Sequence, residues 1–152
     1  NKPPFITIAQ SMQASFAQGG VKVDLLPAAG SQVYARVRAK QHQAAIRLWI
    51  PDYFDAHSNA SAFAWNDGKS STVAGLNGWK IPELNKATLA AVAEPDPAKR
   101  LDLYKKMQEQ LQQNSPYVFV DQGKTQIVVR DNVKGYQQGL NADMVWYDRV
   151  TK

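Results

Sequence analysis

An acidic residue with aromatic neighbours directly follows an apolar stretch, and this is the arrangement in the chain most suited to binding chemistry. Residues 46–50 are mostly apolar and are typical of a buried strand, Pro51 ends the run, and Asp52 and Tyr53 come next. In open α/β sheets, ligands bind just beyond the carboxyl ends of strands. A carboxylate and aromatic rings placed there could hold a cationic or amphipathic ligand. Taken alone, however, an Asp after a proline is more typical of a turn.

A second grouping lies in the same region, where His57 follows Asp52 and Asp55. A metal site needs three or four convergent ligands, so these residues leave open a small hydrolase or metal-dependent enzyme with its site in the 51–67 loop. No G-x-S-x-G, G-x-G-x-x-G or Walker pattern occurs. The absence of cysteine excludes disulfides, thiolate zinc sites and cysteine nucleophiles. The sequence predicts no cofactor and no metal, and it favours a protein that is not an enzyme.

Length and composition fit one globular domain. The chain has 152 residues, of which 44% are apolar and 20% charged, with a net charge of +5. The basic residues are scattered and no recognition motif accompanies them, so we expect no nucleic-acid partner. No apolar run approaches the ~20 residues of a membrane span. The chain opens with Asn-Lys-Pro-Pro rather than Met, which suggests a mature or excised piece.

The elements that must position these residues can be read from periodicity and capping signals. Helices are predicted from Pro4 to Gly19–Gly20, from Ser31, over 58–64, from Pro82, and from Pro97 to about Asn114. Strands are predicted over 21–25, 44–50, 117–120 and 125–130. A strand, a helix and a strand within residues 21–50 predict a βαβ unit with a right-handed crossover. The expected fold class is α/β, a mixed sheet with flanking helices.

Four groups of residues, in order along nearly the whole chain, carry a resemblance to a known family. They are Ile8–Gln10 with Gly20–Val23; Leu48–Tyr53; Trp79–Asn85; and the closing set Asp96–Arg100, Leu103–Tyr104, Ser115–Tyr117 and Asn132–Tyr136. In these segments the chain resembles the C-terminal lobe of the family 5 extracellular solute-binding proteins of bacterial ABC importers, the dipeptide- and oligopeptide-binding type.

The resemblance implies a fold, a function and partners. It implies one lobe of a type II periplasmic-binding-protein-like fold, with residues 1–134 forming the ligand-binding lobe of a larger two-lobe receptor. Residues 135–152 would be a tail that crosses back to the missing N-terminal lobe. Such a receptor is periplasmic, or membrane-tethered on the outer face of the cytoplasmic membrane. It binds a peptide or other small solute and delivers it to an inner-membrane ABC permease.

The resemblance also implies a ligand site. Asp52 occupies the family position whose carboxylate pairs with the α-amino group of a peptide, and backbone groups around Trp49 and Ile50 would pair with the extended ligand. The predicted ligand-binding residues are Trp49, Ile50, Asp52, Tyr53 and His57. The sequence departs from the family pattern at Pro51 and at 54–57. Because family members also carry sugars, opines and nickel chelates, those ligands stay open beside peptides.

Overall fold

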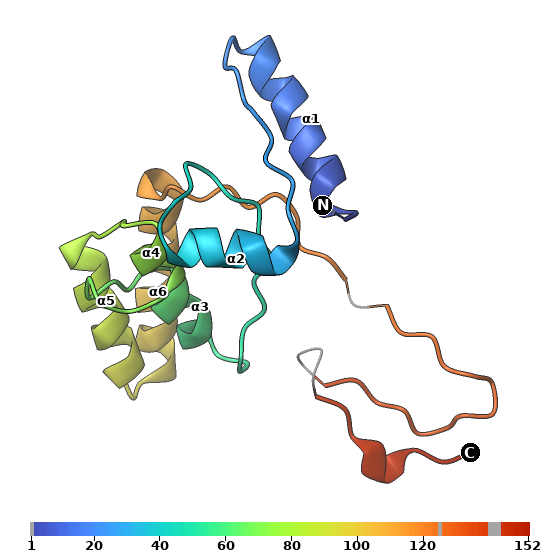
Figure 1. The fold of residues 1–152 in the computed structure, drawn as a ribbon. Coiled ribbons are helices and arrows are strands. Elements are labelled where there is room, and N and C mark those ends of the chain that lie inside the picture. The colour runs from blue at the N-terminus through green and yellow to red at the C-terminus, as the bar shows by residue number, and fades with distance from the viewer. Residues whose placement is uncertain (1, 125, 140–143) are drawn as a thin grey trace. The chain divides into compact units, whose positions relative to one another are not determined.

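The computed structural model describes residues 2–124, 126–139 and 144–152, and it consists of helices joined by open segments (Figure 1). The chain divides into two compact units, Asn1–Trp49 and Ile50–Lys152. The helices are α1 (Phe5–Gln18), α2 (Gly30–Arg38), α3 (Ala56–Phe63), α4 (Val73–Leu76), α5 (Pro82–Ala93), α6 (Pro97–Asn114) and the 3-10 helix η1 (Tyr147–Arg149). None of the described helices is both long and apolar enough to cross a bilayer.

The predicted α/β fold, a mixed sheet with flanking helices, is wrong. The described ranges contain no strand, and their β pairing is limited to two isolated antiparallel bridges, Lys134 with Thr151 and Gln138 with Val145. The βαβ unit and the type II periplasmic-binding-protein-like lobe, both of which need a sheet, are not supported either. Thr125, the first residue of one predicted strand, lies outside the described residues.

The error has a physical reason, because a strand is completed only by hydrogen bonds to a neighbouring strand. Alternating apolar residues show that a segment suits a sheet, but they do not supply its partner. Val118 is 78% exposed and Val128 is 96% exposed, so neither side chain is covered by a second layer. Near residue 118, Tyr117 and Phe119 contact the ring of Phe63 on α3 edge to face, with centroids 5.3 and 5.8 Å apart.

Two helices of the second unit, α5 and α6, begin where local signals predict them. Pro82 is the first residue of α5 and Pro97 the first of α6. The Asp96 carboxylate caps α6 by accepting hydrogen bonds from the backbone N–H groups of Ala98 and Lys99, both at 2.9 Å. The short helix predicted over 58–64 is also present, as α3, and it begins two residues earlier than expected.

The core of the second unit lies between α5 and α6, which form a helical hairpin with α3 packed against both. Leu84, Thr88 and Met107 are its largest fully buried side chains. The Thr88 hydroxyl donates to the carbonyl of Leu84 at 2.8 Å, which satisfies its polar group inside the core. The core cluster comprises Ala60, Ala64, Leu84, Ala91, Tyr104 and Met107.

A pair of asparagines, one buried and one partly buried, fixes the segment between α3 and α5. Asn66 is 3% exposed, and its backbone N–H donates to the side-chain oxygen of Asn85 at 2.8 Å. The Asn85 side-chain amide donates in return to the carbonyl of Asn66, also at 2.8 Å. The Asn66 side chain donates to the carbonyl of Trp79 at 2.7 Å. These bonds hold the irregular segment against α5 without a sheet.

The first unit has little buried surface of its own. None of the residues of α1 is buried, and Val37 is the buried residue of α2. The ring of Tyr34 lies beneath the guanidinium groups of Arg38 and Arg47, each 4.6 Å from the ring centroid.

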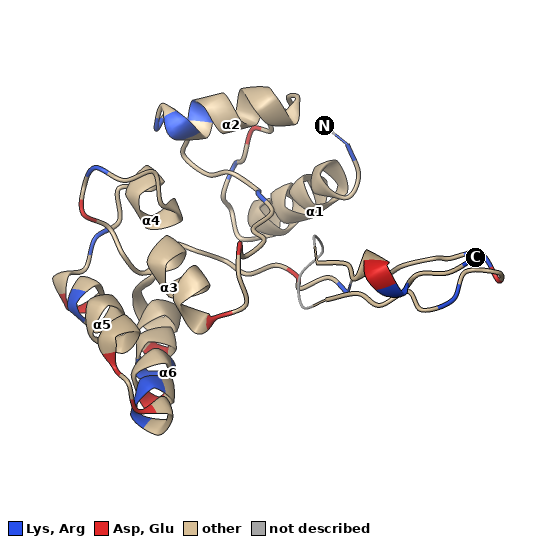
Figure 2. Cartoon of the chain, turned by 90° about the horizontal axis from the view of Figure 1, so that it is seen from below, with Lys and Arg blue, Asp and Glu red and all other residues tan. Residues whose placement is uncertain are grey.

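Charged residues of both signs are interspersed along α5 and α6 (Figure 2). On α6, the exposed side chains of Lys106 and Asp102 form an ion pair of 2.7 Å one turn apart. Mixed signs at this spacing are typical of a solvated helix face.

Replacement of Leu84 by Ala should destabilise the second unit strongly. Leu84 is 0% exposed, so truncation leaves a cavity between α5 and α6 and should lower the free energy of unfolding by about 2–5 kcal/mol. The matched control is Leu89→Ala on the same helix, where Leu89 is 58% exposed and the loss should be small. Urea unfolding measures both variants. Equal losses would contradict the packing described for α5.

Candidate functional site

The predicted ligand-binding residues lie on or beside the exposed loop that precedes α3. Trp49 is the last residue of the first unit and Ile50 the first of the second. Trp49, Ile50 and Tyr53 are 40%, 48% and 47% exposed. Asp52 is also exposed, and its carboxylate makes no hydrogen bond or ion pair with the residues that the structure describes. The loop therefore presents an acid and a phenol ring to solvent.

His57, the fifth predicted residue, lies in the first turn of α3 and is only half-buried. Its backbone N–H donates to the Asp55 carboxylate at 2.7 Å. Its ring atom Nδ1 is buried, with no hydrogen-bond partner among the described residues. The structure thus gives the backbone of His57 a clear role in starting α3.

Asp55 caps α3 and closes the loop. Its side chain accepts from the N–H of His57, and its own backbone N–H donates to the carbonyl of Tyr53 at 3.1 Å. An Asp at this position satisfies a helix N–H group that would otherwise lack a partner. The chain between Tyr53 and His57 is thereby folded into a tight turn at the start of the helix.

The Arg100 guanidinium joins this turn to the rest of the unit. Nη1 donates to Oδ2 of Asp55 at 3.0 Å and Nη2 donates to Oδ1 at 2.6 Å, a bidentate ion pair. Nε donates to the carbonyl of Ala91 at 3.2 Å, and Nη2 also donates to the Tyr104 hydroxyl at 3.1 Å. We call Arg100, Asp55, Tyr104 and the Ala91 carbonyl the Arg100 cluster. It connects the start of α3, the end of α5 and the first two turns of α6.

The electrostatics of the Arg100 cluster follow from these contacts. The hydrogen bonds from Arg100, and then from the backbone of His57, lower the pKa of Asp55 below its ordinary value of 3.8. The hydrogen bond to Asp55 raises the pKa of Arg100. Burial raises the pKa of Tyr104, and the nearby phenol of Tyr53 acts in the same direction. Asp55 is therefore held as a carboxylate, and Tyr53 lies within electrostatic reach of α6.

The predicted site set omitted Arg100 and Tyr104. Their spacing of four residues on α6 places them on one face of the helix, and the cation lies 4.9 Å from the ring centroid. Both residues are part of the closing segment on which the family resemblance rests. The closing segment was therefore the signal that could have pointed to Arg100. Its pairing with Asp55 could not be predicted, because the two residues lie 45 positions apart in the sequence.

The alternative of a metal-dependent enzyme in the 51–67 loop gains no support. Among the described residues, no three His, Asp or Glu side chains come close enough to hold a metal ion. Asp55, one of the three residues considered for that site, is instead committed to Arg100 and to the start of α3.

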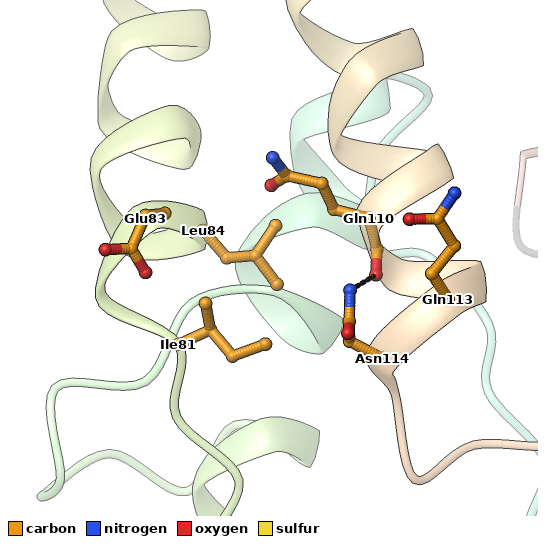
Figure 3. A pocket seen from close by; sticks show the side chains of 6 residues that line it. All are labelled: Ile81, Glu83, Leu84, Gln110, Gln113 and Asn114. Atoms are coloured by element: carbon orange, nitrogen blue, oxygen red, sulfur yellow. Dashed lines mark hydrogen bonds between the residues drawn. The ribbon is translucent and has the colours of Figure 1, made fainter.

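A pocket of about 330 Å³ lies at the other end of the α5–α6 hairpin (Figure 3). The α5 wall carries Glu83, and the α6 wall carries amide side chains. The side chain of Asn114 donates to the backbone carbonyl of Gln110 at 3.0 Å. None of the predicted ligand-binding residues lines it. The lining residues are Ile81, Glu83, Leu84, Gln110, Gln113 and Asn114.

The ion pair between Asp55 and Arg100 should make stability depend on acid pH. Because the folded-state pKa of Asp55 lies below 3.8, the pair stabilises the fold above that pH, and this contribution is lost as the pH falls through the lower folded-state pKa. Asp55→Asn keeps a good helix cap but removes the titrating group. Urea midpoints of the two proteins should differ at pH 7 and converge in acid. A constant difference at every pH would contradict the ion pair.

Comparison with known proteins gives a distant relative. No family model matches the chain. The chain is 27% identical over 140 residues to the "Probable D,D-dipeptide-binding periplasmic protein DdpA" of Escherichia coli (strain K12). The match covers 90% of this chain and 26% of that protein, so the chain spans about a quarter of the relative's length. The relative is described as a periplasmic binding protein, and this chain is distantly similar to part of it.

Proposed function

We propose that this chain is part of a solute-binding protein of an ABC import system, with a peptide or peptide-like zwitterion as its ligand. The observation that carries the proposal is the similarity of 90% of the chain to a protein described as dipeptide-binding. The exposed loop supports it, because Asp52, whose carboxylate has no partner among the described residues, and the neighbouring Tyr53 are both exposed there.

In this proposal Asp52 binds the positively charged α-amino group of the ligand. A charge-assisted hydrogen bond is roughly twice as strong as a neutral one, and it gains strength when a closing cleft excludes water. The rings of Trp49 and Tyr53 would cover the apolar parts of the ligand, and backbone groups near Ile50 would pair with its amide bonds. His57 would line the same site from the first turn of α3.

The remaining partners belong to the same proposal. The relative is about four times as long as the matched region, and we infer that a second lobe, in the full-length protein, supplies the rest of the pocket. Residues 135–152, of which 140–143 lie outside the described residues, would extend towards that lobe. The receptor would act in the periplasm, or tethered to the outer face of the cytoplasmic membrane, and would deliver its solute to a membrane permease.

Titration calorimetry on the full-length protein tests the ligand class. The ligands are matched L,L and D,D dipeptides with free amino groups, and the same dipeptides N-acetylated. We expect binding of at least one free-amine dipeptide, and much weaker binding of its acetylated form, because acetylation removes the positive charge. Binding of an opine, a sugar or a nickel chelate with no binding of any dipeptide would contradict the proposed ligand.

Asp52→Asn should weaken binding of a free-amine dipeptide by roughly 1–3 kcal/mol, the cost of losing a charged hydrogen-bond partner. Asp102→Asn is the matched control, because it removes an exposed carboxylate of α6 outside the loop, and it should leave the affinity unchanged. Calorimetry compares the two variants with the wild-type protein. Unchanged affinity in Asp52→Asn would exclude Asp52 from the ligand site.

A further inference from the structure

We propose that Arg100 is a positioning residue for the ligand site, acting through Asp55 to fix the loop that carries Asp52 and Tyr53. This inference rests on the proposed function and deepens it, because it assigns part of the affinity to a residue that touches no ligand. Its basis is the Arg100 cluster and the exposure of Asp52 and Tyr53 on the loop that Asp55 closes.

Arg100 makes four hydrogen bonds to protein groups. A guanidinium has five N–H donors, and all three nitrogens of Arg100 donate to protein groups, with Nη2 serving two acceptors. The Arg100 and Asp55 side chains are 28% and 35% exposed. The charge of Arg100 is therefore directed at Asp55, and the planar fork sets the orientation of that carboxylate.

The loop depends on the Asp55 carboxylate for its position. Asp52 and Tyr53 are exposed, so burial does not hold their side chains in place. Asp55 comes three residues after Asp52 in the sequence. Its backbone N–H donates a hydrogen bond to the carbonyl of Tyr53. A shift of Asp55 would therefore shift Tyr53 and the backbone that presents Asp52.

The other contacts of Arg100 anchor it to the packed core of the second unit. Tyr104 is 5% exposed and belongs to the core cluster, and Ala91, whose carbonyl accepts from Nε, is 0% exposed. Arg100 thus links the loop to the α5–α6 hairpin and fixes the loop relative to these two helices. A lysine at this position would keep the charge but present a single ammonium group, which cannot reproduce the bidentate geometry.

The test compares Arg100→Lys and Asp55→Asn with the wild-type full-length protein. Asn keeps the cap of α3, so this variant removes the ion pair with Arg100 without removing the start of the helix. Lys106→Met is the matched control, since it breaks an exposed ion pair on the same helix. The first readout is the ratio of the dissociation constants of a dipeptide in its N-acetylated and free-amine forms.

This ratio separates positioning from simple destabilisation. A variant with fewer folded molecules binds both ligands more weakly by the same factor, and the ratio stays constant. Misplacement of Asp52 adds a loss that only the free-amine ligand suffers, because the acetylated ligand has no charged amino group for Asp52 to bind. We expect the ratio to fall by roughly tenfold in Arg100→Lys, to fall also in Asp55→Asn, and to stay unchanged in Lys106→Met.

The second readout needs no ligand. Backbone amide exchange over residues 52–57 should be faster in Arg100→Lys, because the N–H of His57 is bonded to Asp55, while exchange over α5 should stay slow. An unchanged ratio, or unchanged exchange in the loop, would overturn the positioning role. A wild-type protein that binds no dipeptide would overturn the proposed function instead, and the exchange comparison would then decide alone whether Arg100 holds the loop.

Discussion

The bidentate ion pair between Arg100 and Asp55 is the interaction on which the geometry of the candidate site depends. A guanidinium is planar and a carboxylate is planar, so two parallel hydrogen bonds fix orientation as well as distance. The same guanidinium bonds a carbonyl at the end of α5 and the hydroxyl of Tyr104. The start of α3 is thereby held in relation to two longer helices, and the loop before it is held in turn.

The surrounding unit supplies the rigidity that this ion pair needs. Leu84 and Met107 fill the space between α5 and α6, and the reciprocal amide bonds of Asn66 and Asn85 hold the irregular segment between α3 and α5. The buried Asn66 side chain donates to the carbonyl of Trp79 and accepts from the N–H of Gly68, which makes its burial tolerable. Apolar packing and the hydrogen bonds of these asparagines thus both keep the helices beneath the exposed loop in fixed positions.

Local sequence signals predicted the helix starts of α5 and α6. Contacts between residues far apart in the sequence could not be predicted in this way. Pro82, Pro97 and Asp96 mark helix starts through their own backbone and side-chain chemistry, so the sequence alone located α5 and α6. The expected sheet depended on partners that alternation cannot identify, and the described segments make no ladder. The loop with Asp52 was recognisable from its neighbours. Its anchor was not, because Asp55 and Arg100 are far apart in sequence.

The most direct test of the central claim is a crystal structure of the full-length protein with a free-amine dipeptide bound. The account predicts the amino nitrogen of the ligand within hydrogen-bond distance of the Asp52 carboxylate, with the Asp55–Arg100 pair intact behind it. A bound dipeptide whose amino group meets another residue, or one that displaces Asp55 from Arg100, would contradict the account.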